Sequence, residues 1–220
     1  MNSFINNAPG PHTGQPVLTA GESPETARAA MLMVHGRGAT AEDILGLAGE
    51  LNQPGFFYLA PQAANDEWYP NRFTAPLESN EPYLSSALAT LATLLTQLAS
   101  AGIGPERTII LGFSQGACLA LEFVARHARR YGGMAGLSGG LIGPAGTPRD
   151  YAGSMAETTV FLGCSDVDPH IPRERVHETT EVFRRLGGNV TERLYRGMGH
   201  TINLDEIEFV RAMMSALTAE

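Results

Sequence analysis

The pentapeptide Gly112-Phe113-Ser114-Gln115-Gly116 follows the apolar run Thr108-Ile109-Ile110-Leu111 and precedes the helix-forming sequence Ala117-Cys118-Leu119-Ala120-Leu121. This order predicts a buried strand, a tight turn and a helix. A serine in such a Gly-x-Ser-x-Gly turn can take a strained backbone conformation that raises its hydroxyl above the edge of a sheet. Gly112 is expected to allow close approach of backbone, and Gly116 is expected to let the helix pack tightly on the strand. The motif alone is a weak signal, because many α/β proteins contain such turns without catalysis.

Strand and helix patterns alternate through the rest of the chain. Apolar or extended runs of strand length lie at residues 15–19, 29–34, 56–60, 108–111, 132–138, 158–162 and 189–196. Helical periodicity marks residues 84–98, the segment after Ser114, residues 173–186 and the segment from about Asn203. Two helix starts carry capping pairs, Thr40 with Asp43 and Asn203 with Glu206. The pattern predicts an α/β fold with a mostly parallel central sheet, helices on both faces and a ligand site at the carboxyl ends of the strands.

The composition favours one domain and excludes several kinds of chemistry. The 220 residues are 43% hydrophobic and 17% charged, which is enough for one well-buried domain. A net charge of −8 argues against a main role in binding nucleic acid or anionic membranes, because both require clustered basic surface. The sequence contains no lysine, so a Schiff-base lysine, a P-loop lysine and a Ser-Lys dyad are all excluded.

The two cysteines, Cys118 and Cys164, are too few for a disulfide framework and lack metal-ligand spacing. We interpret them as small buried hydrophobic residues and expect neither a metal nor a cofactor. The N-terminal sequence 1–10 lacks the basic and apolar regions of a secretory signal, and no later apolar segment is long enough to span a membrane. We therefore expect a cytoplasmic protein that binds neither nucleic acid nor membranes. The sequence leaves open whether it forms a homodimer.

If Ser114 is a nucleophile, it requires a base to accept its proton and an acid to orient that base. Each should come from a loop at the same edge of the sheet. Asp168 lies in the loop after the strand 158–162, and His200 lies in the loop after the strand 189–196. The chain order serine, aspartate, histidine is used by only one of the common serine-hydrolase folds. Ser114, Asp168 and His200 are therefore the candidate catalytic residues.

Acyl transfer to a serine also requires an oxyanion hole, in which two backbone N–H groups face the developing negative charge. The amide of Gln115 is one candidate, because it directly follows the nucleophile. The other donor is expected in the glycine-flanked turn 35–38, which follows the first core strand. We assign it to the backbone amide of Arg37 and not to its guanidinium group.

Taken together, these motifs resemble the phospholipase/carboxylesterase group of α/β-hydrolases, which includes the acyl-protein thioesterases and is near the dienelactone hydrolases. The resemblance spans residues 30–218 and rests on His35-Gly36-x-Gly38, Gly112-Phe113-Ser114-Gln115-Gly116, Asp168-Pro169-x-x-Pro172 and Gly197-Met198-Gly199-His200. It implies an α/β-hydrolase fold without a large cap domain, esterase chemistry, and a triad of Ser114, Asp168 and His200. Dienelactone hydrolases usually have cysteine at the position of Ser114, so that activity is less favoured.

Other residues offer alternatives for the acid and the base. Asp166 lies two positions before Asp168 and is the alternative acid; the resemblance favours Asp168. His170 shares a loop with the acid, and we interpret it as a solvated neighbour because base and acid normally come from separate loops. His35 is expected to have a structural role in its loop. The remaining three histidines are expected on the surface: His12, His127 and His177.

Two further patterns suggest other functions. Residues 36–41 fit the G-x-G-x-x-A dinucleotide pattern, which would indicate a nucleotide-dependent oxidoreductase. The next strand ends in Leu59-Ala60-Pro61-Gln62 and lacks the acidic residue that would bind the ribose. Residues 177–181 resemble a zinc-binding helix, but Glu181 occupies the position of the second histidine ligand. We therefore expect neither site.

The long polar and aromatic loop 62–80 is the main candidate for a substrate pocket, because loops of this length in a compact domain are usually functional or disordered. Trp68 and Tyr69, together with Phe73, can line such a pocket, or can instead pack the loop onto the domain. Met198 is a further candidate for its wall, because it is close to His200 in the sequence.

The sequence thus predicts a catalytic domain over residues 30–220, preceded by an N-terminal extension and edge strand over residues 1–29. The predicted function is hydrolysis of small carboxylic esters or thioesters through an acyl-Ser114 intermediate. A catalytically silent binding protein with the same fold is the alternative from another class. The physiological ester and its acyl length do not follow from the sequence.

Overall fold

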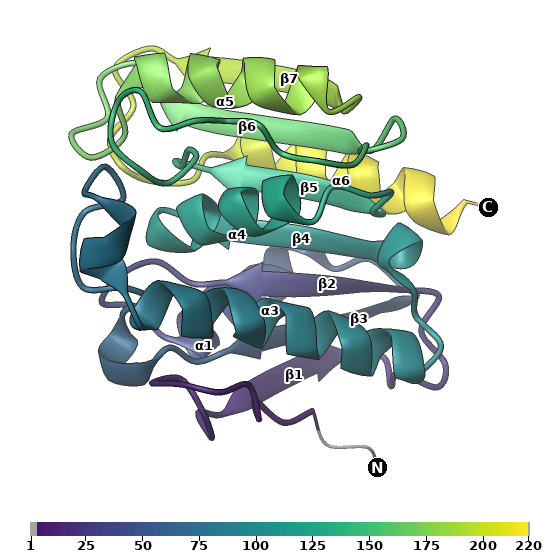
Figure 1. Ribbon diagram of the computed structural model, residues 1–220. Helices are drawn as coiled ribbons and strands as arrows, with labels where there is room; N and C mark the ends of the chain where they lie inside the picture. The colour runs from purple at the N-terminus through teal and green to yellow at the C-terminus, as the bar shows by residue number, and fades with distance from the viewer. Residues whose placement is uncertain (1–3, 220) are drawn as a thin grey trace.

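A seven-stranded sheet, in the order β1-β3-β2-β4-β5-β6-β7, forms the centre of the protein. The computed structural model describes residues 4–219. The strands are β1 (Val17–Gly21), β2 (Ala29–Val34), β3 (Phe56–Pro61), β4 (Thr108–Phe113), β5 (Gly133–Leu137), β6 (Thr159–Ser165) and β7 (Asn189–Tyr195). β1 pairs antiparallel with β3, and every other pair of neighbours is parallel (Figure 1). The predicted mostly parallel sheet is therefore confirmed.

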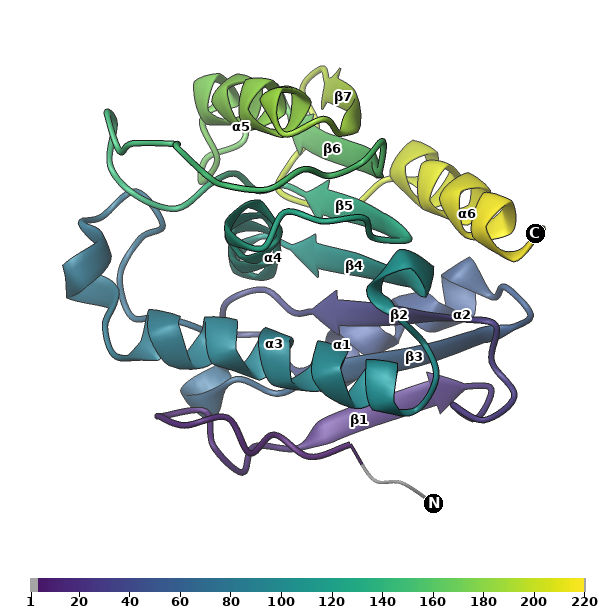
Figure 2. The ribbon, with the colours of Figure 1, turned by 45° about the vertical axis from the view of Figure 1, so that its right-hand side comes forward.

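Helices cover both faces of the sheet, which gives three layers (Figure 2). One face carries α3, α4 and α5, and the other carries α1, α2 and α6. Their bounds are α1 (Ala41–Leu45), α2 (Leu47–Leu51), α3 (Tyr83–Ser100), α4 (Gln115–Arg126), α5 (Arg173–Arg185) and α6 (Leu204–Thr218). No helix within residues 4–219 combines the length and apolar character needed to cross a membrane.

The central strands contain uninterrupted apolar runs because both of their faces are buried. In β2, the side chains of Ala30, Leu32 and Val34 belong to the core under α3 and α4. The alternate side chains Met31 and Met33 belong to the second core, under α1 and α6. One strand therefore contributes to two hydrophobic layers, as expected from the period-two alternation of strand side chains.

Both predicted helix starts are present as capping boxes. Thr40 accepts a hydrogen bond from the amide of Asp43, and Asn203 accepts one from the amide of Glu206. Two boundaries differ from expectation. The helix that follows Thr40 divides at Gly46 into two five-residue helices. β6 continues to Ser165, beyond the predicted end of this strand at residue 162, and so includes Cys164.

The segment before β1 packs against the domain. The Phe4 ring lies 5.1 Å from the ring of Phe57 in β3. The prediction of a surface position for His12 is wrong: its side chain is fully buried and contacts the rings of Trp68 and Tyr83. Residues 1–3 of the predicted extension and residue 220 of the predicted domain lie outside the described residues.

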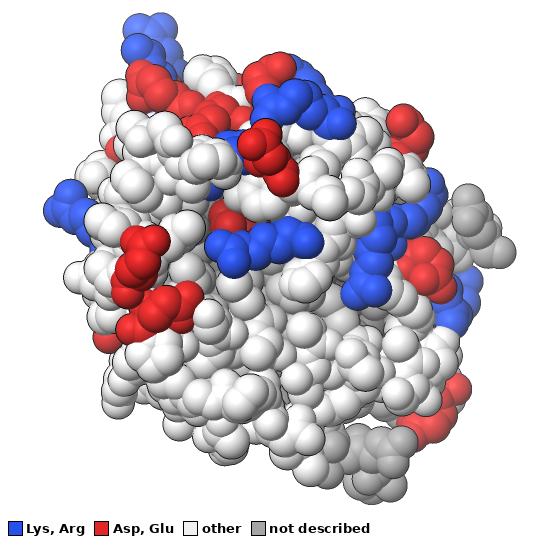
Figure 3. Space-filling view, viewed as in Figure 1, with Lys and Arg blue, Asp and Glu red and all other residues white. Residues whose placement is uncertain are grey.

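Charged side chains on the face shown in Figure 3 are of both signs and are interspersed, and no broad basic area gathers there. A wide part of this face, over α3, is uncharged. The 18 residues of α3 contain no acidic or basic side chain.

The strand order reverses at β2, because β3 lies on one side of it and β4 on the other. At such a point, the loops that leave the carboxyl ends of the strands diverge and open a crevice. The loops after β2, β4, β6 and β7 all begin at this edge of the sheet. They carry Arg37, Ser114, Asp168 and His200, respectively.

Candidate active site

Ser114 occupies the sharp turn between β4 and α4. Its backbone angles are φ 55° and ψ −120°, a conformation that is costly for a residue with a side chain. The amide of Ser114 donates to the carbonyl of Leu137 in β5 at 2.9 Å, which fixes the turn against the sheet. A Cβ at Gly112 would lie 2.4 Å from the carbonyl oxygen of Gly116, and one at Gly116 would lie 2.2 Å from that of Val34. The close approaches expected at these two glycines are therefore present.

A continuous hydrogen-bonded chain joins Ser114, His200 and Asp168. The Nε2 atom of His200 lies 2.8 Å from the Oγ atom of Ser114, and its Nδ1 atom lies 2.7 Å from the Oδ2 atom of Asp168. A carboxylate can only accept, so Nδ1 carries the proton and Nε2 is left to accept from the serine hydroxyl. The ring of Phe113 packs beside the His200 ring, with 5.0 Å between centroids.

The side chain of Asp168 is buried beneath His200 and is surrounded by donors. Its Oδ1 atom accepts from the amides of His170 at 2.8 Å and Ile171 at 3.0 Å, while the Cys164 thiol lies 3.8 Å from Oδ2. Burial opposes ionisation, but the hydrogen bonds from His200 and the two amides outweigh it and hold the pKa of Asp168 below its ordinary value. The carboxylate is therefore ionised at neutral pH.

The structure distinguishes Asp166 from Asp168. Asp166 accepts from the amide of Gly197 at 2.8 Å and so ties the loop after β6 to the turn after β7. His170 is exposed and packs edge-on against the ring of His200, with 4.8 Å between centroids. It also lines the cavity over Ser114, which the sequence-based interpretation did not anticipate.

The backbone amides of Arg37 and Gln115 both belong to residues that line this cavity. Among residues 4–219, neither amide has a hydrogen-bond acceptor. Gln115 is the first residue of α4, where amides have no partner within the helix and favour negative charge. Two donors without an acceptor in residues that line the same cavity as Ser114 suit a developing oxyanion.

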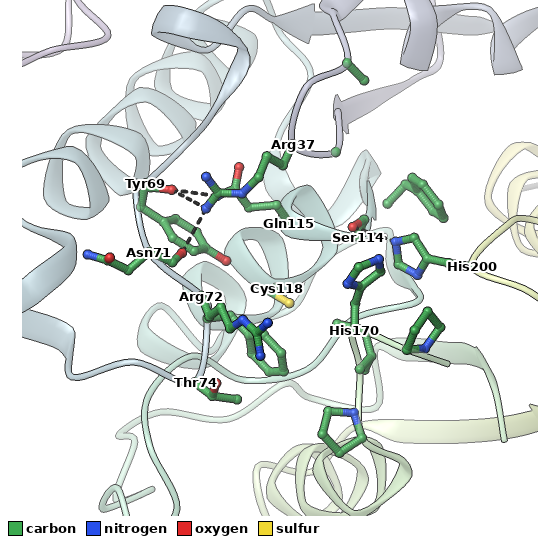
Figure 4. A pocket seen from close by; sticks show the side chains of 17 residues that line it. Arg37, Tyr69, Asn71, Arg72, Thr74, Ser114, Gln115, Cys118, His170 and His200 are labelled. Atoms are coloured by element: carbon green, nitrogen blue, oxygen red, sulfur yellow. Dashed lines mark hydrogen bonds between the residues drawn. The ribbon is translucent and has the colours of Figure 1, made fainter. Parts of the chain in front are cut away.

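The side chains of these two residues hold the long loop in place. The Arg37 guanidinium donates to the carbonyls of Tyr69 at 2.6 Å and Asn71 at 2.8 Å, and it pairs with Glu67 (Figure 4). The Gln115 carboxamide accepts from the amide of Trp68 at 2.9 Å and donates to the carbonyl of Tyr69 at 2.7 Å. The guanidinium of Arg37 is thus bound to the loop, whereas its backbone amide has no acceptor among residues 4–219.

Two buried histidines support the same loop. His35 donates from Nδ1 to the carbonyl of Gly36 at 2.8 Å and accepts at Nε2 from the amide of Ala63 at 3.1 Å. His12 accepts at Nδ1 from the amide of Ala64 at 3.0 Å and lies 3.0 Å from the carbonyl of Trp68 through Nε2. Burial lowers the pKa of both rings, which are therefore neutral. The structural role expected for His35 is confirmed.

A cavity of about 450 Å³ opens over Ser114. Tyr69 and Phe73 line it, as expected from the sequence, but Trp68 and Met198 do not. The Trp68 indole is fully buried and donates to the carbonyl of His35 at 2.9 Å, so it packs the loop onto the domain. The Met198 sulfur accepts from the side chain of Asn203 at 2.9 Å, which directs it towards the start of α6.

The lining of the cavity also includes residues that the sequence did not single out: Asn71, Arg72 and Thr74 from the long loop, and Ile171 from the loop after β6. The position of the long loop after a strand predicted the region, but no pattern showed which of its side chains would face inward. Figure 4 shows Tyr69 and Arg72 on the opposite side of the cavity from Ser114 and His200.

This geometry defines the protein as an α/β-hydrolase, and within residues 4–219 no large cap domain covers the site. The phospholipase/carboxylesterase family model matches residues 15–218, so the chain belongs to that family. By its description, the family comprises phospholipases and carboxylesterases, which are enzymes that hydrolyse esters.

Curated relatives and solved structures agree with this assignment. Acyl-protein thioesterase 1 of Gibberella zeae is 28% identical over 74% of this chain and 68% of its own length. Acyl-protein thioesterase 1 of Saccharomyces cerevisiae is 30% identical over 60% of each chain, so the match spans less than two thirds of that relative. A phospholipase/carboxylesterase from Dyadobacter fermentans has a TM-score of 0.89 and 39% identity, over 94% of this chain and 99% of its own. Esterase PE8 has a TM-score of 0.75 and 25% identity, over 92% of this chain and 98% of its own.

Proposed function

We propose that the protein hydrolyses carboxylic esters or thioesters through an acyl-enzyme intermediate on Ser114, with His200 as the base and Asp168 as its orienting acid. The observation that carries the proposal is the hydrogen-bonded chain from Ser114 Oγ through His200 to Asp168 Oδ2. The serine hydroxyl can pass its proton to His200 Nε2 as its oxygen attacks the carbonyl carbon. The imidazolium formed in that step is stabilised by the ionised Asp168.

The tetrahedral intermediate places a negative charge on the former carbonyl oxygen. The unpaired amides of Arg37 and Gln115 are the proposed donors to this oxygen. When the intermediate collapses, His200 returns the proton to the leaving alcohol or thiol, and Ser114 retains the acyl group. Water then attacks the acyl-enzyme with His200 again as the base, which releases the acid and restores the serine.

Labelling with a fluorophosphonate probe and hydrolysis of 4-nitrophenyl esters of increasing acyl length test the proposal together. The wild-type protein is expected to gain one probe adduct and to release nitrophenol, and Ser114→Ala is expected to do neither. An unlabelled wild-type protein without esterase activity would favour a silent binding protein with this fold. Hydrolysis that survives Ser114→Ala would contradict the proposed nucleophile.

The compartment proposed for the enzyme is the cytoplasm. Both cysteines, Cys118 and Cys164, are buried and unpaired, as is usual in a reducing compartment. Burial raises the pKa of each thiol to about 12, so neither is poised as a nucleophile.

The proposed substrate is a small molecule, because a cavity of about 450 Å³ lies within the usual range of small-molecule sites.

A further inference from the structure

The charges on the cavity wall differ from those of the whole chain. The sequence has 23 acidic and 15 basic residues. Nevertheless, among residues 4–219 no aspartate or glutamate lines the cavity, whereas its lining includes the arginines Arg37 and Arg72. The cavity wall therefore carries positive charge in an acidic protein.

Arg72 is the uncompensated charge of this set. The guanidinium of Arg37 pairs with Glu67 and with carbonyls of the long loop. Within residues 4–219, the side chain of Arg72 makes neither an ion pair nor a hydrogen bond. An exposed guanidinium that borders a substrate cavity can bind a carboxylate through two parallel hydrogen bonds.

A second, independent observation concerns Tyr69. Tyr69 is 1% exposed, and its hydroxyl has no hydrogen-bond partner within the described part of the chain; the nearby Cys118 thiol adds to burial in raising the pKa of Tyr69 but does not satisfy the hydroxyl by distance and angle. Buried hydroxyl groups are almost always paired, so this donor fits an acceptor supplied by a ligand. Tyr69 and Arg72 lie on the same side of the cavity, away from Ser114 (Figure 4).

We infer that the enzyme prefers esters or thioesters that carry a carboxylate at a distance from the scissile bond, and that Arg72 and Tyr69 bind this carboxylate. The inference rests on the proposed esterase function and adds the substrate class. The neutral wall on the other side, formed by Phe113 and Pro169 among others, can then hold the uncharged part of the substrate.

Two pairs of substrates test the inference, because the charge can lie on either side of the scissile bond. Mono-4-nitrophenyl adipate and its methyl ester differ in a carboxylate charge on the acyl side of the scissile bond. 4-Acetoxybenzoate and its methyl ester differ in a carboxylate charge on the alcohol side. The measured quantity is the ratio of kcat/KM for the charged and neutral member of each pair. Comparing this ratio between variants cancels the intrinsic reactivity of the esters.

In at least one pair, Arg72→Gln is expected to lower the ratio about tenfold or more, the range set by a hydrogen-bonded charge. Arg72→Lys is expected to retain part of the preference, and Tyr69→Phe is expected to lower it by a smaller factor. Arg185→Gln is the matched control, since it removes an exposed arginine from the last turn of α5, the helix whose N-cap residue Pro172 lines the cavity. Its ratio should equal that of the wild type.

Ratios in Arg72→Gln that match the wild type for both pairs would overturn the inference. An equal fall in Arg185→Gln would also overturn it, because the effect would then be one of net charge. Absence of hydrolysis of all four esters, charged and neutral, by the wild-type protein would instead contradict the proposed function. The two failures are therefore distinguishable.

Discussion

The carboxamide oxygen of Gln115 accepts a hydrogen bond from the backbone amide of Trp68 at 2.9 Å. This bond joins the residue after the proposed nucleophile to a loop that lies 47 positions earlier in the chain. Gln115 thus has two proposed roles in one residue: its backbone amide is a proposed oxyanion donor at the cavity, and its side chain fixes the loop that forms the cavity wall.

Replacement of Gln115 by alanine should separate these roles. The backbone amide remains, but the amide of Trp68 and the carbonyl of Tyr69 lose their buried partner, so we expect a loss of roughly 2 to 4 kcal/mol in the free energy of unfolding. KM should rise more than kcat falls, because the wall moves while the proposed donors stay. Denaturant unfolding and ester kinetics measure the two effects. Gln97→Ala, which removes exposed hydrogen bonds to Ile5, is the control and should cost less than about 1 kcal/mol.

Replacing each of the two aspartates after β6 by asparagine should have very different effects on kcat. Asp168→Asn should lower kcat by as much as about 10⁴-fold, because an amide no longer fixes the productive tautomer of His200. Asp166→Asn keeps an oxygen acceptor for the amide of Gly197 and should change kcat less than about tenfold. Steady-state hydrolysis of one 4-nitrophenyl ester is sufficient for both. Equal losses in the two variants would argue against Asp168 as the orienting acid.

The sequence predicted the elements near Ser114 well, because each strand there is buried on both faces and therefore uninterrupted in its apolar pattern. It could not predict which residues of the loop 62–80 face the cavity. The orientation of the loop depends on hydrogen bonds from Arg37 and Gln115, which belong to other parts of the chain. The sequence left open whether Trp68 lines the pocket or packs the loop onto the domain, and the structure has the second arrangement, with Trp68 fully buried. His12 was missed for the same reason, since its partners lie 52 and 56 positions away.

A buried carboxyl group at the start of α6 should make stability depend on pH. Glu206 is fully buried, its Oε1 atom has no partner within residues 4–219, and burial raises its pKa to about 7. The folded state therefore holds a proton that the unfolded chain releases above the ordinary pKa of a glutamate. Its contribution favours folding at about pH 4 to 5 and is lost as the pH rises through 7. The cost of ionisation above pH 7 is on the order of 3 kcal/mol.

Glu206→Gln should remove this dependence while keeping a residue that suits the capping box. Relative to the wild type, the variant should gain stability between pH 5 and pH 8, as measured by urea unfolding at each pH. Glu208→Gln changes an exposed residue on the same helix, and its free energy of unfolding should depend on pH in the same way as that of the wild type. A parallel curve for Glu206→Gln as well would show that Glu206 titrates normally.

The buried ring of His12 should make stability depend on pH with the opposite sign, so that stability falls as the pH falls. Burial lowers its pKa, so below about pH 6.5 the unfolded chain binds a proton that the folded protein does not. The contribution of the neutral ring is present above that pH and is lost as the pH falls. His12→Gln, whatever its stability at pH 7, should therefore lose less stability than the wild type between pH 7 and pH 5. His177→Gln, which replaces an exposed histidine, is the control for the loss of an imidazole.

Gly116 provides the sharpest test of the turn around Ser114. A methyl group at this position would lie 2.2 Å from the carbonyl oxygen of Val34 and 2.4 Å from that of His35, and both are backbone atoms that cannot turn aside. Gly116→Ala must therefore push α4 away from β2 and shift the amides of Arg37 and Gln115 relative to each other. We expect a loss of at least about 3 kcal/mol in the free energy of unfolding, with kcat reduced in the protein that remains folded.

The matched substitution is Gly49→Ala in α2. Position 49 is exposed and helical, and a Cβ there meets nothing within 4 Å. Alanine should stabilise this helix by about 0.5 to 1 kcal/mol, because it loses less conformational entropy on folding than glycine. Thermal unfolding of the two variants should therefore move in opposite directions. A Gly116→Ala protein with wild-type stability and kcat would mean that the helix can retreat without disturbing the site, and that the close contact at Gly116 is not what positions Ser114.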